Sequence, residues 1–109
     1  MDLWQEIQEK KEKLNKAIDT LARNGRDLAE KERDYKMAVN KKALQLRAED
    51  MPVTLINQVI YGYEDIADLR FKRDTAEVVY NSNLEYINVI KLVLRILENQ
   101  LDREYGNSK

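Results

Sequence analysis

The stretch Glu49-Asp50-Met51-Pro52 lies near the middle of a chain of 109 residues and contains its only proline. Proline inside a helix removes a hydrogen bond and clashes with the preceding turn, but it fits the first turn of a new helix. The residues on both sides are mostly strong helix formers, and no alternation of apolar and polar residues is long enough to indicate a strand. The sequence therefore predicts an all-α protein whose chain folds back at this stretch.

Two long helices are expected on either side of the turn. The first covers residues 3–48, the turn covers 49–52, and the second helix covers 53–105. Asp50 and Thr54 are both candidates to cap the start of the second helix, because their side-chain oxygens can accept a hydrogen bond from its free amides. The pattern predicts a long antiparallel helical hairpin.

Gly62 is a second place at which the helix pattern can break. Glycine inside a helix costs about 1 kcal/mol relative to alanine, so a break here would leave a short helix over residues 53–61. We expect a single helical-hairpin domain over residues 1–105, followed by a disordered tail at 106–109.

Apolar residues recur at alternating steps of three and four along both predicted helices. This spacing of 3.5 residues, kept over six heptads, is typical of a coiled-coil-like seam. The second helix carries the seam Leu55, Val59, Gly62, Ile66, Leu69, Arg73, Ala76, Tyr80, Asn83, Ile87, Ile90, Leu94, Leu97 and Leu101. The first helix carries Trp4, Ile7, Lys11, Leu14, Ile18, Leu21, Gly25, Leu28, Glu32, Tyr35, Val39, Lys42 and Leu46.

Two charged residues of opposite sign occupy this seam. If Leu46 lies opposite Val59, the antiparallel register places Glu32 opposite Arg73. We expect these two side chains to form a structural ion pair, with their charged groups within about 4 Å. The alternative is that each side chain extends separately to water.

The second helix has more apolar residues near its C-terminal end than one partner helix can cover. Besides the seam it carries Tyr86, Val89, Leu92, Val93 and Ile96. An exposed apolar stripe of this kind indicates an interface. The simplest closure is a homodimer of two hairpins, which gives a four-helix bundle, and the alternative is a different protein docked on the same residues.

The composition excludes most of the chemistry that enzymes use. The chain has no cysteine and no histidine, so it lacks the usual metal ligands, the thiolate nucleophile and the commonest general base. Its three glycines are isolated and form no phosphate-binding loop. The net charge of −1 creates no strong field that would attract nucleic acid or an anionic membrane. We therefore expect a non-enzymatic protein without metal or cofactor.

Two further surfaces are candidates for binding. Arg70, Lys72 and Arg73 could contact the phosphates of a nucleic acid, and the phenyl ring of Phe71 could stack on a base. This accessory nucleic-acid-binding role is the alternative to protein–protein interaction. Tyr61 and Tyr63, which flank Gly62, form another candidate partner surface.

The sequence also predicts that the protein does not enter a membrane. Its most apolar stretch, residues 86–97, has about 12 residues, whereas a spanning helix needs roughly 20. The first residues carry no basic segment followed by an apolar one, so we expect no signal peptide and a cytoplasmic location.

The second half contains the stretches Met51-Pro52-Val53-Thr54-Leu55-Ile56, Leu69-Arg70-Phe71-Lys72-Arg73-Asp74, Ile87-Asn88-Val89-Ile90-Lys91 and Leu94-Arg95-Ile96-Leu97-Glu98-Asn99-Gln100-Leu101. With these stretches the chain resembles, over roughly residues 43–105, a family of short, helical, largely uncharacterised proteins encoded by phages and prophages of Gram-positive bacteria. It supplies no catalytic residue, and it implies a role in phage DNA metabolism or in control of a host factor, through an unidentified phage or host protein in the host cell cytoplasm. The family pattern has glycine before Met-Pro, where this chain has Asp50.

Overall fold

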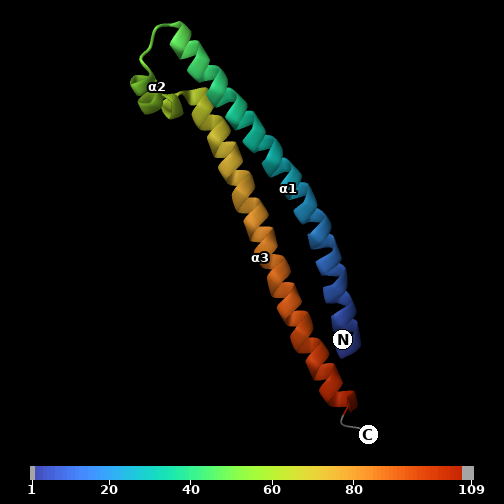
Figure 1. The fold of residues 1–109 in the computed structure, drawn as a ribbon. Helices are drawn as coiled ribbons and strands as arrows, with labels where there is room; N and C mark the ends of the chain where they lie inside the picture. Colours follow the sequence, from blue (N-terminus) through green and yellow to red (C-terminus); the bar gives the residue numbers. More distant parts are fainter. Residues whose placement is uncertain (1, 107–109) are drawn as a thin grey trace. The chain divides into compact units, whose positions relative to one another are not determined.

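The computed structural model describes residues 2–106, and these residues form helices and no strand. The elements are α1 (Leu3–Ala48), α2 (Val53–Val59), a 3-10 turn (Ile60–Gly62) and α3 (Glu64–Gly106), as Figure 1 shows. The predicted all-α fold class is therefore confirmed.

The helices end at or near the two predicted breaks, the stretch 49–52 and Gly62. The helix α1 has the predicted bounds, whereas the second predicted helix is interrupted after Gly62. Tyr63, with φ −67° and ψ 135°, is extended and separates the 3-10 turn from α3. Gly106 still belongs to α3, and the other residues of the predicted tail, 107–109, lie outside the described residues.

The contacts of the chain form two units, each of which is described by itself. Unit 1 contains residues 1–23 and 80–109, and unit 2 contains residues 24–79. Both α1 and α3 contribute to each unit.

In unit 1 the N-terminal part of α1 packs against the C-terminal part of α3. Its core consists of Ile7, Ile90 and Leu94, surrounded by half-buried leucines from both helices. Lys11 lies 3.9 Å from Glu98, and the side chain of Asn83 reaches Ala17. Position numbers that rise along α1 thus fall along α3, so the two segments run antiparallel, as the blue and red segments in Figure 1 show.

Asn83 is a polar residue within the apolar seam of unit 1. Its Nδ2 donates a hydrogen bond of 3.0 Å to the backbone carbonyl of Ala17, which is itself buried. This bond joins α3 to the backbone of α1 across 66 positions of sequence.

In unit 2 the short helix α2 folds back onto the end of α1. Ile56 and Ile60 are buried against Leu46, and Val39, Ala43, Met51 and Tyr63 pack around them. A helix of seven residues is not stable by itself in water. Burial of an isoleucine or leucine side chain contributes about 1.5–3 kcal/mol, so this cluster holds α2 in place.

The predicted seam is present throughout α3. Every seam position from Ile66 to Leu101 is buried or half-buried, and Ile66 is fully buried. In α2 the prediction is wrong at Leu55, which is 42% exposed, whereas Ile56 is buried. The phase changes because α2 is a separate helix that docks on Leu46 and does not continue the seam of α3.

Only one of the two seam rows predicted for α1 holds along its whole length. The row from Ile7 to Lys42 is buried or half-buried, but Trp4, Lys11 and Ile18 of the other row are exposed. Ala17 is buried in place of Ile18. A straight helix of 3.6 residues per turn drifts by about 20° per heptad against a 3.5-residue repeat. Consistent with this drift, the residues spaced by seven positions from Ala17 and the residues of the predicted row that contains Ile18 are all half-buried between residues 24 and 39.

The turn after α1 closes in a Schellman motif. Asp50 has a φ of 67°, which is the left-handed conformation usually taken by glycine after a helix. The amide of Met51 donates to the carbonyl of Leu46 at 3.1 Å, and the amide of Asp50 donates to the carbonyl of Arg47 at 3.0 Å. Met51 also packs on the cluster that contains Leu46, which is the hydrophobic contact typical of this motif.

The prediction that Asp50 or Thr54 caps the second helix was wrong. Asp50 ends α1, and Pro52 stands at the N-cap position of α2 without a side-chain cap hydrogen bond. Its carbonyl accepts the amide of Ile56 at 3.0 Å. Proline suits this place because its fixed φ directs the chain into the new helix.

Replacement of Asp50 by glycine is expected to stabilise the protein by up to about 1 kcal/mol. Glycine takes the left-handed conformation without the steric cost of about 1–2 kcal/mol that most residues incur, and its freedom in the unfolded chain offsets part of this gain. The substitution also removes a negative charge near a helix C-terminus. Urea unfolding followed by circular dichroism measures the change. Asp50→Val, the contrasting variant, is expected to be less stable than the wild type, and equal stabilities of all three proteins would contradict the role given to this conformation.

Candidate protein-interaction surface

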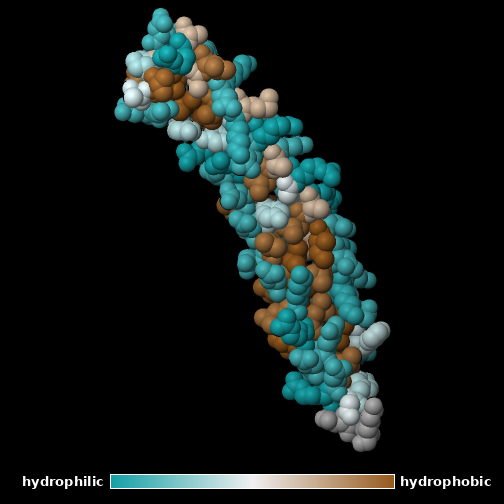
Figure 2. All heavy atoms as spheres, in the orientation of Figure 1, coloured by the Kyte–Doolittle hydropathy of each residue, from teal (hydrophilic) through white to brown (hydrophobic). Residues whose placement is uncertain are grey.

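The helix α3 exposes an apolar stripe within unit 1. Four of its side chains are about half exposed, namely Tyr86 at 46%, Val89 at 57%, Leu92 at 53% and Ile96 at 53%. Val93, which lies between them, is half-buried. We call these five residues the α3 stripe, and Figure 2 shows apolar side chains gathered along this part of α3.

The stripe is separate from the seam that holds unit 1 together. The residues Ile87, Ile90 and Leu94 of the seam are buried. At 3.6 residues per turn, the stripe lies roughly a third of a turn round the helix from this seam. The helix α1 covers one of the two apolar faces of α3, so the other remains in contact with water.

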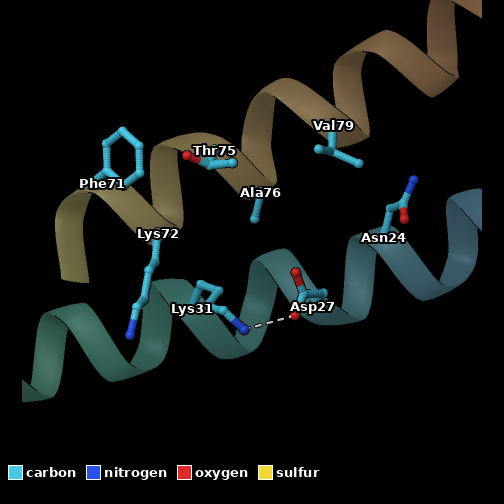
Figure 3. A pocket seen from close by; sticks show the side chains of 8 residues that line it. All are labelled: Asn24, Asp27, Lys31, Phe71, Lys72, Thr75, Ala76 and Val79. Carbon is cyan, nitrogen blue, oxygen red and sulfur yellow. Dashed lines mark hydrogen bonds and ion pairs between the residues drawn. The ribbon is translucent and has the colours of Figure 1, made fainter. Parts of the chain in front are cut away.

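Unit 2 contains a shallow groove between α1 and α3 with a volume of about 260 Å³. Figure 3 shows Ala76 directed toward α1 and Lys72 extended across to it, whereas Phe71 stands away from α1. The groove is lined by Asn24, Asp27, Lys31, Phe71, Lys72, Thr75, Ala76 and Val79.

An ion pair borders this groove on the side of α1. Lys31 Nζ lies 2.9 Å from Asp27 Oδ1, and this hydrogen bond raises the pKa of Lys31 above its ordinary value. The pair is one helical turn apart on an exposed face, an arrangement that stabilises a helix by a few tenths of a kcal/mol. Lys31 and Asp27 are therefore paired with each other within α1.

The residues predicted to contact nucleic acid do not act as one group. Phe71, which is 72% exposed, and Lys72 both line the groove. The guanidinium of Arg70 instead lies 5.8 Å from the centre of the Tyr61 ring, within the range of a cation–π contact. Phe71 and Lys72 thus line one groove with side chains that point in different directions, as Figure 3 shows. Arg70 instead lies at the 3-10 turn, and Arg73 pairs with Asp74.

The structure gives Glu32 and Arg73 different partners from the direct pair that the register predicted. Glu32 lies 3.3 Å from Lys36, while Arg73 lies 2.8 Å from Asp74 and stacks at 4.7 Å over the ring of Tyr35. The hydrogen bond from Arg73 to Asp74 raises the pKa of Arg73 above its ordinary value, with a smaller contribution from the charge of Glu32. Arg73 pairs with Asp74 because this carboxylate is within reach on the same helix, while the guanidinium also covers the ring of the buried Tyr35.

A cluster that sequence reasoning missed joins α1 to the start of α3 in unit 2. Lys42 Nζ lies 3.0 Å from Asp65 Oδ2 and 4.9 Å from the ring centre of Tyr63. Asp65 Oδ1 also accepts the amide of Ile66 at 3.0 Å. The hydrogen bond from Lys42 lowers the pKa of Asp65, and the Ile66 amide adds to this. The sequence contained one indication of this cluster, which is the position of Lys42 in the apolar seam. A charged group there needs a polar partner at the edge of the seam.

Residues 2–106 contain no group of three or more acidic side chains placed to hold a metal ion. No helix within the same range has the length and apolar content needed to cross a membrane.

Asp65→Asn is expected to destabilise the protein at neutral pH but not in acid. The native pKa of Asp65 is lowered from 3.8, so its ionised form contributes stability above about pH 4 and loses this contribution as the pH falls through the native pKa. Urea unfolding midpoints at pH 7 and at progressively lower pH measure the difference. Asp68→Asn, an exposed aspartate of α3 without an ion pair among the described residues, is the matched control. A deficit of Asp65→Asn that persists unchanged in acid would exclude this origin.

Comparison of the chain with protein-family models, with curated proteins and with solved structures found no significant match.

Proposed function

We propose that the protein is non-enzymatic and acts by binding another protein through the α3 stripe. The observation that carries this proposal is the exposure of Tyr86, Val89, Leu92 and Ile96 on one face of α3, beside a seam that α1 already covers. Large apolar side chains gathered on one face cost free energy in water and are typical of interaction sites. The scarcity of catalytic residue types in the sequence supports the same proposal.

The finer predictions about the fold belong to this proposal. The chain would be a long antiparallel helical hairpin of coiled-coil type, and two copies would close into a four-helix bundle. The resemblance to phage and prophage proteins supports a cytoplasmic role in phage DNA metabolism or in control of a host factor. The partner in that case is a phage or host protein.

Nucleic-acid binding is the second candidate function, and one observation favours it. Phe71 is 72% exposed and, like Lys72, lines the groove of unit 2, so this surface offers a ring for an unpaired base and a cation for a phosphate. Arg70 would have to leave Tyr61 to contribute a second phosphate contact.

The double variant Val89→Ser/Ile96→Ser is expected to lose its binding partner while keeping its fold. Both side chains are more than half exposed, so their truncation leaves the core of unit 1 intact. The measurement is affinity capture from phage-infected or lysogenic cells, with circular dichroism as the test of folding. Val78→Ser, another exposed valine of α3, is the control and should capture the same protein as the wild type. Equal capture by all three proteins would refute the role of the stripe.

If the second candidate is correct, single-stranded DNA should bind at low salt and the affinity should fall steeply as salt is added. Removal of one phosphate contact by Lys72→Ala should lower the slope of log K against log salt by about one. Fluorescence anisotropy with a labelled oligonucleotide measures both quantities, and Lys91→Ala, an exposed lysine in unit 1, serves as control. Absence of binding at low salt would exclude this function.

A further inference from the structure

We infer that the α3 stripe packs against the same stripe of a second copy of the chain, with the two α3 helices antiparallel about a two-fold axis near residue 91. This inference rests on the proposed function, puts a second copy of the chain on the stripe in place of a phage or host protein, and specifies the orientation of that copy. In a two-fold interface each surface must match itself, so the spacing and charge of the stripe can be tested for self-complementarity.

The spacing of the stripe is symmetric along the helix. Residues 86 and 96 lie five positions on either side of residue 91, and residues 89 and 93 lie two positions on either side of it. An antiparallel pair of helices centred there places Tyr86 opposite Ile96 and Val89 opposite Val93 of the second copy. Leu92 lies beside the axis and meets its own counterpart. All five residues of the stripe then find an apolar partner.

The charges that border the stripe are also complementary under this operation. Glu85 and Arg95 are exposed, and neither has an ion-pair partner among the described residues of its own chain. Antiparallel packing brings Glu85 beside Asn99 and Arg95 of the second copy, so an amide and a guanidinium can both donate to the carboxylate. The two-fold axis repeats this contact at the other end of the stripe.

The rest of unit 1 offers no alternative surface of matching length. The exposed large apolar side chains on its part of α1 are Trp4 and Ile18, and polar Gln8, Lys11 and Asn15 lie between them on that face. A second copy therefore covers the α3 stripe with α3 and not with α1. In this arrangement each α1 helix lies roughly a third of a turn round its own α3 from the partner's α3 helix.

Engineered cysteines test the orientation directly, because the natural chain contains none. Tyr86→Cys and Ile96→Cys are prepared separately and oxidised alone and as a mixture. A disulfide requires Cα atoms within about 7 Å. Residue 86 lies ten positions, or about 15 Å, from the partner's residue 86 in the antiparallel arrangement, so each variant alone should stay uncrosslinked. The mixture should form a mixed disulfide between the two variants on a non-reducing gel.

A second pair of variants tests the charges, with the dimer dissociation constant measured by sedimentation. Glu85→Arg should weaken the dimer by a factor of about two to thirty, because the two-fold axis removes two exposed ion pairs per dimer. The double variant Glu85→Arg/Arg95→Glu should restore it. Rescue by the double variant would support the antiparallel contact, and failure of rescue would count against it.

Crosslinking of Tyr86→Cys with itself would overturn the antiparallel orientation in favour of a parallel one. A mass of 12.9 kDa by light scattering, with no crosslink in the mixture, would overturn self-association altogether. That result would leave the proposed function standing if Val89→Ser/Ile96→Ser still lost a captured protein that Val78→Ser retained. Loss of both effects would refute the inference and the proposed function together.

Discussion

The structure depends on one constraint, which is that a helix can hide its apolar side chains only against another element. The helices α1 and α3 meet this constraint in each unit by covering one face of each other, with Ile7, Ile90 and Leu94 at the centre of unit 1. The short helix α2 meets it by docking Ile56 and Ile60 on Leu46. No third long helix exists among the described residues to cover the second apolar face of α3. The apolar side chains of the α3 stripe therefore stay exposed, with no element of the described residues to cover them.

Much of the fold could be predicted from the sequence because helix periodicity is a local property. The single proline marked the turn, the bounds of α1 were correct, and the seam of α3 held from Ile66 to Leu101. The errors arose where local rules compete with packing. Trp4 and Ile18 were assigned to the seam of α1 on a fixed 3.5-residue repeat, which a real helix of 3.6 residues per turn does not keep. Leu55 was misplaced because the phase of α2 is set by its docking on Leu46.

The candidate site was predictable in part for the same reason. Exposure of Tyr86, Val89, Leu92 and Ile96 follows from the count of apolar residues on one helix against the number of neighbours. The partners of charged side chains could not be obtained in this way. Arg73 contacts Asp74 and Tyr35, and Lys42 contacts Asp65 and Tyr63. Long side chains such as these have several possible partners within reach. Sequence spacing places the backbone of such residues but does not choose among their rotamers.

The hydrogen bond from Asn83 to the carbonyl of Ala17 has a consequence for how the two helices of unit 1 find their alignment. A seam of leucine and isoleucine alone would tolerate a slip of one heptad, since apolar side chains fit one another at many positions. Asn83 is half-buried, and its hydrogen bond to Ala17 is made in the observed alignment. Loss of such a hydrogen bond in a slipped alignment costs about 0.5–1.5 kcal/mol. Asn83 therefore favours the observed pairing of α1 with α3, at the expense of some of the apolar burial that a leucine would give.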